Sequence, residues 1–92
     1  MEDGMNGTTL SGFEYTVSAE AMDDMELLEA LSDIDNGGKY WQFSKALMIM
    51  FGKDQKEAYY SFLREKHGRV PMSVVFEDIE EILTGNGEVK NS

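Results

Sequence analysis

The chain has 92 residues, no cysteine, and 18 acidic against 8 basic side chains, which gives a net charge of −10. This length predicts one domain, and the missing cysteines exclude a disulfide framework, a thiolate metal site and a cysteine nucleophile. The charge is unevenly spread, because residues 1 to 38 hold ten acids and no base, whereas residues 39 to 69 hold seven bases and three acids.

This charge pattern disfavours binding to nucleic acid, because acidic flanks repel phosphates and the middle segment is only mildly basic. The N-terminus has no apolar leader segment, so no secretion signal is expected. The longest strictly apolar run, residues 46 to 51, is far too short to span a membrane. We therefore expect neither a nucleic acid nor a membrane as partner.

Residues 1 to 7, MEDGMNG, are polar and glycine-rich, which predicts a flexible N-terminus. The next segment, TTLSGFEYTV, alternates, with Phe13, Tyr15 and Val17 on one face. The pair Ser11-Gly12 suits a two-residue turn between two short strands. Because a lone hairpin is unstable in water, its apolar face is expected to pack on helices.

Asp23 and Glu26 are spaced as a capping pair and predict the start of a first helix. Four apolar residues at helical spacing are expected to form its buried stripe: Met25, Leu28, Leu31 and Ile34. Leu27 flanks this stripe, and Asn36-Gly37-Gly38 ends the helix.

Residues 40 to 51, YWQFSKALMIMF, predict a second helix that ends at Gly52. Trp41 and Met48 lie opposite its main apolar face, with Lys45 between them and Ile49 at a flank. The main face contains Tyr40, Phe43, Ala46, Leu47, Met50 and Phe51. A helix that is apolar on nearly all sides is either central in its fold or has a second partner. Both readings stay open, and the second makes Trp41, Lys45, Met48 and Ile49 partner-binding residues.

Asp54 begins a third helix that ends at Gly68, and Pro71 suits the start of a fourth. The fourth helix should bury Met72, Val75, Phe76, Ile79, Ile82 and Leu83. Its acids are expected in solvent: Glu77, Asp78, Glu80 and Glu81. Together these patterns predict a mainly α fold, with a short N-terminal β-hairpin packed on a bundle of about four helices. The single domain covers residues 8 to 85, and residues 86 to 92 form a flexible C-terminal tail.

The segment DIDNGGKYWQFS, residues 33 to 44, resembles a calcium loop only in part. Asp33, Asp35 and Gly38 match, but Gly37 offers no ligand and Ser44 stands where a bidentate glutamate is needed. The single histidine, His67, stands beside the glycine that ends the third helix, which suits capping better than catalysis. We therefore expect no metal, no cofactor, no catalytic residue and no enzymatic activity.

The order of features resembles the small tail assembly chaperones of phages with long, non-contractile tails. The resemblance covers residues 8 to 92 and rests on the hairpin, DDMELLEAL, the apolar helix ending in MFGKDQKEAYYSFL, and REKHGRVPMSVVFEDIEEIL. The family often has a tryptophan near the place of Met25, and this chain departs from that pattern. Members are also made in a longer form by ribosomal frameshifting, and this chain resembles the short, pre-frameshift form.

The resemblance implies a non-enzymatic protein that binds and solubilises the helical tape measure protein and helps recruit tail-tube subunits. It implies the cytoplasm of the bacterial host as the location and absence from the mature virion. Pairing of the acidic first third with the basic middle would also allow a homo-oligomer. Two alternatives remain, an acidic phage interaction module (an antirepressor or a DNA mimic) and a structural head–tail completion protein.

Overall fold

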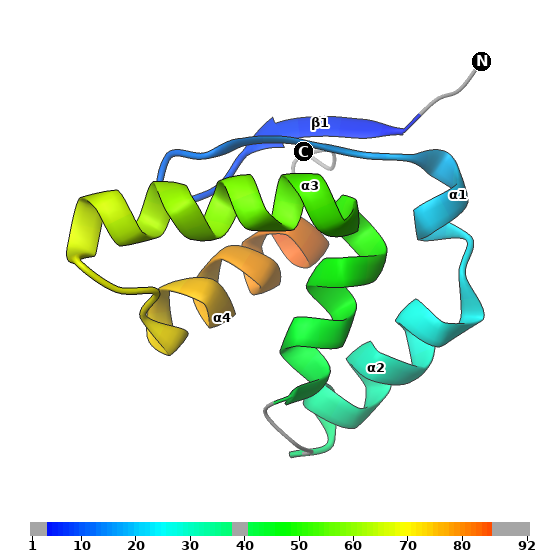
Figure 1. The fold of residues 1–92 in the computed structure, drawn as a ribbon. Coiled ribbons are helices and arrows are strands. Elements are labelled where there is room, and N and C mark those ends of the chain that lie inside the picture. Colours follow the sequence, from blue (N-terminus) through cyan, green and yellow to red (C-terminus); the bar gives the residue numbers. More distant parts are fainter. Residues whose placement is uncertain (1–3, 38–40, 86–92) are drawn as a thin grey trace.

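The computed structural model describes residues 4–37 and 41–85 and confirms the mainly α architecture with an N-terminal hairpin and about four helices. The elements in chain order are β1 (Met5–Thr8), β2 (Glu14–Val17), α1 (Ala19–Met22), α2 (Met25–Asp35), α3 (Trp41–His67), α4 (Met72–Glu80) and a π-helical turn, η1 (Glu81–Gly85). The hairpin runs along the second half of α3, α2 lies beside the first half, and α4 lies beneath (Figure 1).

The hairpin begins earlier than the sequence predicts. β1 pairs antiparallel with β2, with Met5 opposite Val17 and Thr8 opposite Glu14. Residues 5 to 7, which we expected to be flexible, are therefore part of a strand, whereas residues 1 to 3 lie outside the described part of the chain. The predicted two-residue turn is also wrong, since five residues from Thr9 to Phe13 connect the strands. Thr9 closes this loop, because its backbone N–H donates to the Phe13 carbonyl oxygen at 2.8 Å.

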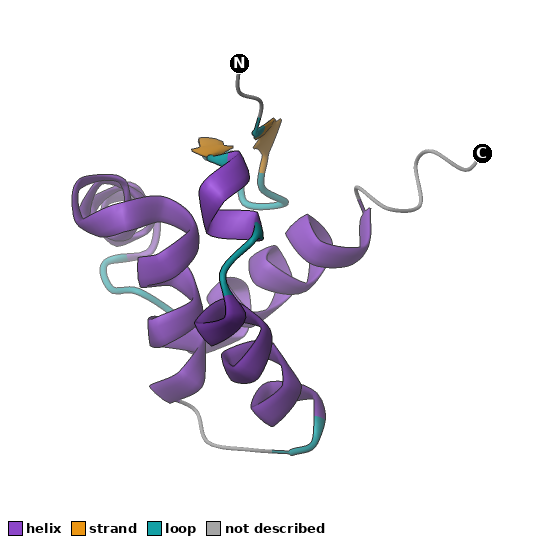
Figure 2. Ribbon diagram, turned by 90° about the vertical axis from the view of Figure 1, so that its right-hand side faces the viewer, coloured by secondary structure: helices purple, strands orange, loops and turns teal. Residues whose placement is uncertain are grey.

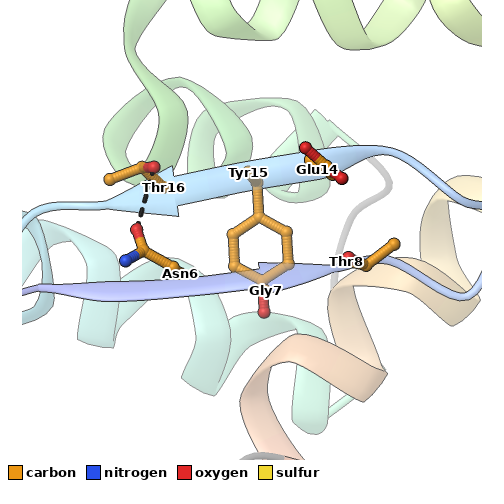
Figure 3. Close-up of a pocket in the computed structure, with 6 residues that line it drawn as sticks. All are labelled: Asn6, Gly7, Thr8, Glu14, Tyr15 and Thr16. Atoms are coloured by element: carbon orange, nitrogen blue, oxygen red, sulfur yellow. Dashed lines mark hydrogen bonds between the residues drawn. The ribbon is translucent and has the colours of Figure 1, made fainter.

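Gly7 allows a close approach between the two strands. The Tyr15 ring extends from β2 across Gly7 of β1, beside an Asn6–Thr16 hydrogen bond (Figure 3). A Cβ atom on Gly7 would lie 2.6 Å from the Tyr15 hydroxyl oxygen, which is closer than non-bonded carbon and oxygen atoms approach. The hollow at this place is about 520 Å³ and is lined by residues of both strands: Asn6, Gly7, Thr8, Glu14, Tyr15 and Thr16.

The cap of α2 and its buried face both differ from the prediction. Asp24, not Asp23, caps the helix, because its carboxylate accepts from the Glu26 backbone N–H at 2.8 Å. The side of α2 that faces the core carries the buried Leu27 and Ala30 and the half-buried Leu31, and the half-buried Ile34 lines a groove beside it. Met25 and Leu28, which we expected to be buried, are instead largely exposed.

Gly52 divides α3 into two helical halves, as the sequence predicts. Its backbone has φ 79° and ψ 168°, a combination that is essentially restricted to glycine. Two side chains fix the arrangement around the break. Lys56 donates to the Ser44 hydroxyl at 2.9 Å, and the Gln55 amide pairs with both backbone polar groups of Thr16 in β2. The second half of α3 is thereby tied to both the first half and the hairpin.

Substituting Gly52 with alanine is expected to lower the free energy of unfolding by about 1–3 kcal/mol, because a Cβ is strained at this φ and ψ. For a domain of this size each kcal/mol lowers the melting temperature by about 4–8 °C, which thermal denaturation followed by circular dichroism measures. The control is Ser61→Ala, an exposed position inside the same helix, where alanine is a favourable helix former. An unchanged melting temperature for Gly52→Ala would contradict the strained geometry.

The core connects the hairpin with both halves of α3, α2, α4 and η1, and the strands form a layer at one side of the helices (Figure 2). Its centre is aromatic, since the Phe13 ring centroid lies 5.2 Å from that of Tyr59 and the Phe51 ring meets Tyr59 edge-on at 5.6 Å. The fully buried large side chains are Tyr59, Leu47, Leu63, Ile79, Ile82, Val17 and Asp78. Asp78 is in this list although we expected it to face solvent.

Candidate functional site

The first candidate surface is the outward side of the first half of α3. Trp41, Lys45 and Met48 lie there, and we call them the α3 outer face. Trp41 is 66% exposed and Met48 43% exposed. The opposite side of the same helix is buried, including Leu47 and Met50, because successive residues on a helix are turned by about 100°.

Of the four predicted partner-binding residues, three therefore share one exposed face. The fourth, Ile49, is half-buried and packs against the core, so it supports the face rather than forming part of it. Tyr40, which we assigned to the buried side, lies outside the described residues.

A second apolar surface lies between α2 and α4, and the sequence did not reveal it. A groove of about 590 Å³, here called the α2–α4 groove, is lined by Leu28, Leu31, Ser32, Ile34, Phe43, Phe76, Ile79, Glu80 and Leu83. The rings of Phe43 and Phe76 stack with their centroids 3.9 Å apart and their planes inclined by 22°. These two rings also line a smaller hollow of about 280 Å³, together with Met72. Phe43 thus brings α3 into a groove whose other walls come from α2, α4 and η1.

The walls of this groove are strongly acidic in sequence. Residues 25 to 35 and 72 to 85, which form α2, α4 and η1, contain eight acids and no base. Basic side chains gather elsewhere, including Arg64, Lys66 and His67 in the last turn of α3. Asp78 is one of these acids but is buried away from the groove, whereas Glu80 is part of the lining. The groove therefore combines an apolar lining with a negatively charged edge along α4.

Asp78 occupies a different position from the one predicted. The sequence places it on the solvent side of its helix, but it is only 1% exposed. Its carboxylate accepts hydrogen bonds from the Ser11 backbone N–H at 3.1 Å, the Ser11 hydroxyl at 2.6 Å and the Tyr59 hydroxyl at 2.6 Å. Lys66 donates to the Ser11 carbonyl oxygen and also lies over the Phe62 ring. We call Asp78, Ser11 and Tyr59 the hairpin latch, because they fasten the hairpin loop to α3 and α4.

Because of the latch, the stability of the fold is expected to fall at high pH. Burial, followed by the hydrogen bond to Asp78 and the negative charge of that carboxylate, raises the pKa of Tyr59 far above its ordinary value of 10.0. Above about pH 10 the unfolded chain loses this proton while the folded chain keeps it, so stability falls as the pH rises. The expected slope from Tyr59 approaches about 1.4 kcal/mol per pH unit.

Urea unfolding of the wild type and of Tyr59→Phe between pH 9 and pH 12 measures this slope. The phenylalanine variant is expected to start less stable, but to lose less stability per pH unit. Equal slopes in the two proteins would show that Tyr59 ionises normally in the fold.

Two side chains of the segment that partly resembles a calcium loop have other partners. Asp33 accepts a hydrogen bond from the Gln42 amide, and Ser44 accepts from Lys56; Gly38 and Lys39 lie outside the described residues. Among residues 4–37 and 41–85, no group of three or more histidine, aspartate or glutamate side chains is placed to hold a metal ion. Within the same ranges no helix is long and apolar enough to cross a membrane.

Comparisons with known proteins identify no relative. No family model matches the chain, and neither the curated proteins nor the solved structures contain a match.

Proposed function

We propose that this chain is a tail assembly chaperone of a phage with a long, non-contractile tail. It binds the tape measure protein through the α3 outer face and keeps it soluble until tail-tube subunits replace the chaperone. The observation that carries the proposal is the exposure of Trp41 and Met48 on a helix whose opposite side already forms the core. The order of sequence features from residue 8 onward supports the same function.

The chemistry of this face suits a helical protein partner. Tryptophan is strongly enriched among the residues that dominate binding energy at protein interfaces. Methionine adapts its shape to irregular apolar surfaces, and Lys45 between them offers a charged contact. A tape measure protein presents apolar stripes along a great length, so many copies of a small binder can each make a modest contact.

The charge of the chain supports its proposed role in keeping the tape measure protein soluble. A net charge of −10 would keep a coated tape measure protein soluble. The proposed function needs no covalent bond to be made or broken, so the chaperone acts by binding alone. It works in the cytoplasm of the bacterial host and leaves before the tail is complete.

Co-expression with the tape measure protein of the same phage tests the proposal. Alone, the tape measure protein is expected in the insoluble fraction. Together with an affinity-tagged copy of this chain, it is expected in the soluble fraction and in the eluate of the affinity column. A tape measure protein that stays insoluble beside soluble chain would overturn the proposal.

Mass spectrometry of finished particles separates the proposal from its structural alternative. A chaperone is expected to be missing from purified virions, whereas a head–tail completion protein would be present. The acidic surface also fits an interaction module that mimics DNA, and that function predicts a DNA-binding host protein in the eluate in place of the tape measure protein.

A further inference from the structure

We propose that the α2–α4 groove is a second binding surface, distinct from the α3 outer face, and that it takes one basic amphipathic helix of another polypeptide. The inference goes beyond the proposed function, since it rests on the groove and not on Trp41. It follows from the shape of the groove, from the charge around it and from the surfaces that a second copy of this chain could offer.

The lining is suited to the apolar stripe of a helix. Leu28 is 58% exposed on the α2 wall, and Leu31 and Leu83 are half-buried on opposite walls. The stacked Phe43 and Phe76 rings form part of the same surface. A groove of about 590 Å³ has room for a few aliphatic side chains, and a helix supplies such side chains at intervals of three and four residues.

The charge around the groove favours a bound helix with positive charge. Glu80 is part of the lining, and Glu77 is exposed on the same helix, α4. Three of the elements that line the groove, α2, α4 and η1, contain no base, and the fourth, α3, contributes Phe43 to the lining. Lysine or arginine side chains along one edge of a bound helix would meet the carboxylates of α4, whereas an acidic helix would be repelled.

A second copy of the chain does not offer such a helix within its described residues. The basic part of α3 carries Arg64, Lys66 and His67, but its apolar residues Tyr59 and Leu63 are completely buried in the core of the same molecule. The α3 outer face is apolar, but it contains a single base, Lys45. A separate cationic helix therefore complements the groove better than a second copy does.

Fluorescence anisotropy with a synthetic peptide tests the inference on the full-length chain. The probe is a labelled helical peptide of leucine and lysine, about 18 residues or five turns long, with its leucines on one face. One control has the same composition in an order that spreads leucine around the helix, and another replaces every lysine with glutamate. The amphipathic basic peptide is expected to bind at least about tenfold more tightly than either control. Equal binding of the amphipathic and reordered peptides would overturn the inference.

A matched pair of variants locates the binding. Leu28→Lys places a positive charge on the groove wall and is expected to weaken peptide binding about tenfold or more. Leu10→Lys makes the same change at a site that is 66% exposed on the hairpin loop, and it should leave binding nearly unchanged. Equal losses in both variants would mean attraction to the net charge alone and would overturn the inference.

Two further measurements separate this inference from the proposed function and from self-association of the chain. Trp41→Glu is expected to bind the peptide as the wild type does. Loss of binding to the tape measure protein and loss of binding to the peptide therefore report on different surfaces.

Sedimentation equilibrium shows whether a second copy of the chain fills the groove. A dimer that Leu28→Lys dissociates, in a protein that does not bind the peptide, would show that a second copy fills the groove and would overturn the inference.

Discussion

Replacing Asp78 with alanine is expected to lower the free energy of unfolding by about 3 kcal/mol. The substitution leaves the Tyr59 hydroxyl, which is fully buried, without an acceptor, and it removes both acceptors of Ser11. An unsatisfied buried donor costs about 1–3 kcal/mol, and relief from burying a charge offsets part of the total. A domain of this size has about 5–10 kcal/mol of stability, so the loss would be large. Equilibrium unfolding in urea, followed by circular dichroism, gives the value.

Two variants show whether the hydrogen bonds cause the loss. Asp78→Asn keeps one acceptor oxygen and is expected to lose clearly less stability than Asp78→Ala. Glu77→Ala removes the neighbouring acid, which is exposed, and should change stability by less than about 0.5 kcal/mol. If all three variants were equally stable, the latch would contribute nothing to the fold.

Replacing Trp41 with glutamate is expected to abolish co-purification of the tape measure protein while the fold remains intact. The side chain is 66% exposed, so a polar substitute meets water in the free chain and leaves the core unchanged. In a complex, the same carboxylate would lose its water against an apolar partner, which costs several kcal/mol and lowers affinity by two orders of magnitude or more. Affinity capture from co-expressing cells measures the bound fraction.

The control for Trp41→Glu is Leu10→Glu. Leu10 has the same exposed fraction as Trp41, lies on the hairpin loop and receives the same charge. The Leu10 variant should capture as much tape measure protein as the wild type. Unchanged capture by Trp41→Glu, in a protein with a native circular dichroism spectrum, would place the binding site elsewhere.

The helical periodicity predicted the elements better than it predicted which side of each helix is buried. In α2, the expected stripe advanced in steps of three residues from Met25 to Ile34. Each step falls about 60° short of a full turn, so this line winds around the helix, and of its four residues Leu31 is the one that packs against the core. Leu27 and Ala30 are on the buried side. The sequence pattern placed Leu27 at the flank of the stripe and assigned no role to Ala30.

Asp78 shows a second limit of the sequence pattern. An acid between apolar residues usually faces water, and only the donors on Ser11 and Tyr59 make its burial favourable. Those donors lie far away in the sequence, so no local pattern reveals them. The α2–α4 groove was missed for the same reason, because its walls come from separate elements. Trp41 and Met48 were placed correctly opposite the buried side, since that relation is set within one helix.

The hairpin latch also constrains when the domain can be completed. Ser11 and Asp78 are 67 positions apart, so the strands are synthesised long before the carboxylate that anchors their loop. The chain must therefore be synthesised through Asp78, and that residue must leave the ribosome, before the hairpin is fixed in place. A nascent chain truncated ahead of Asp78 should exchange its strand amides freely, and the extended chain should protect them.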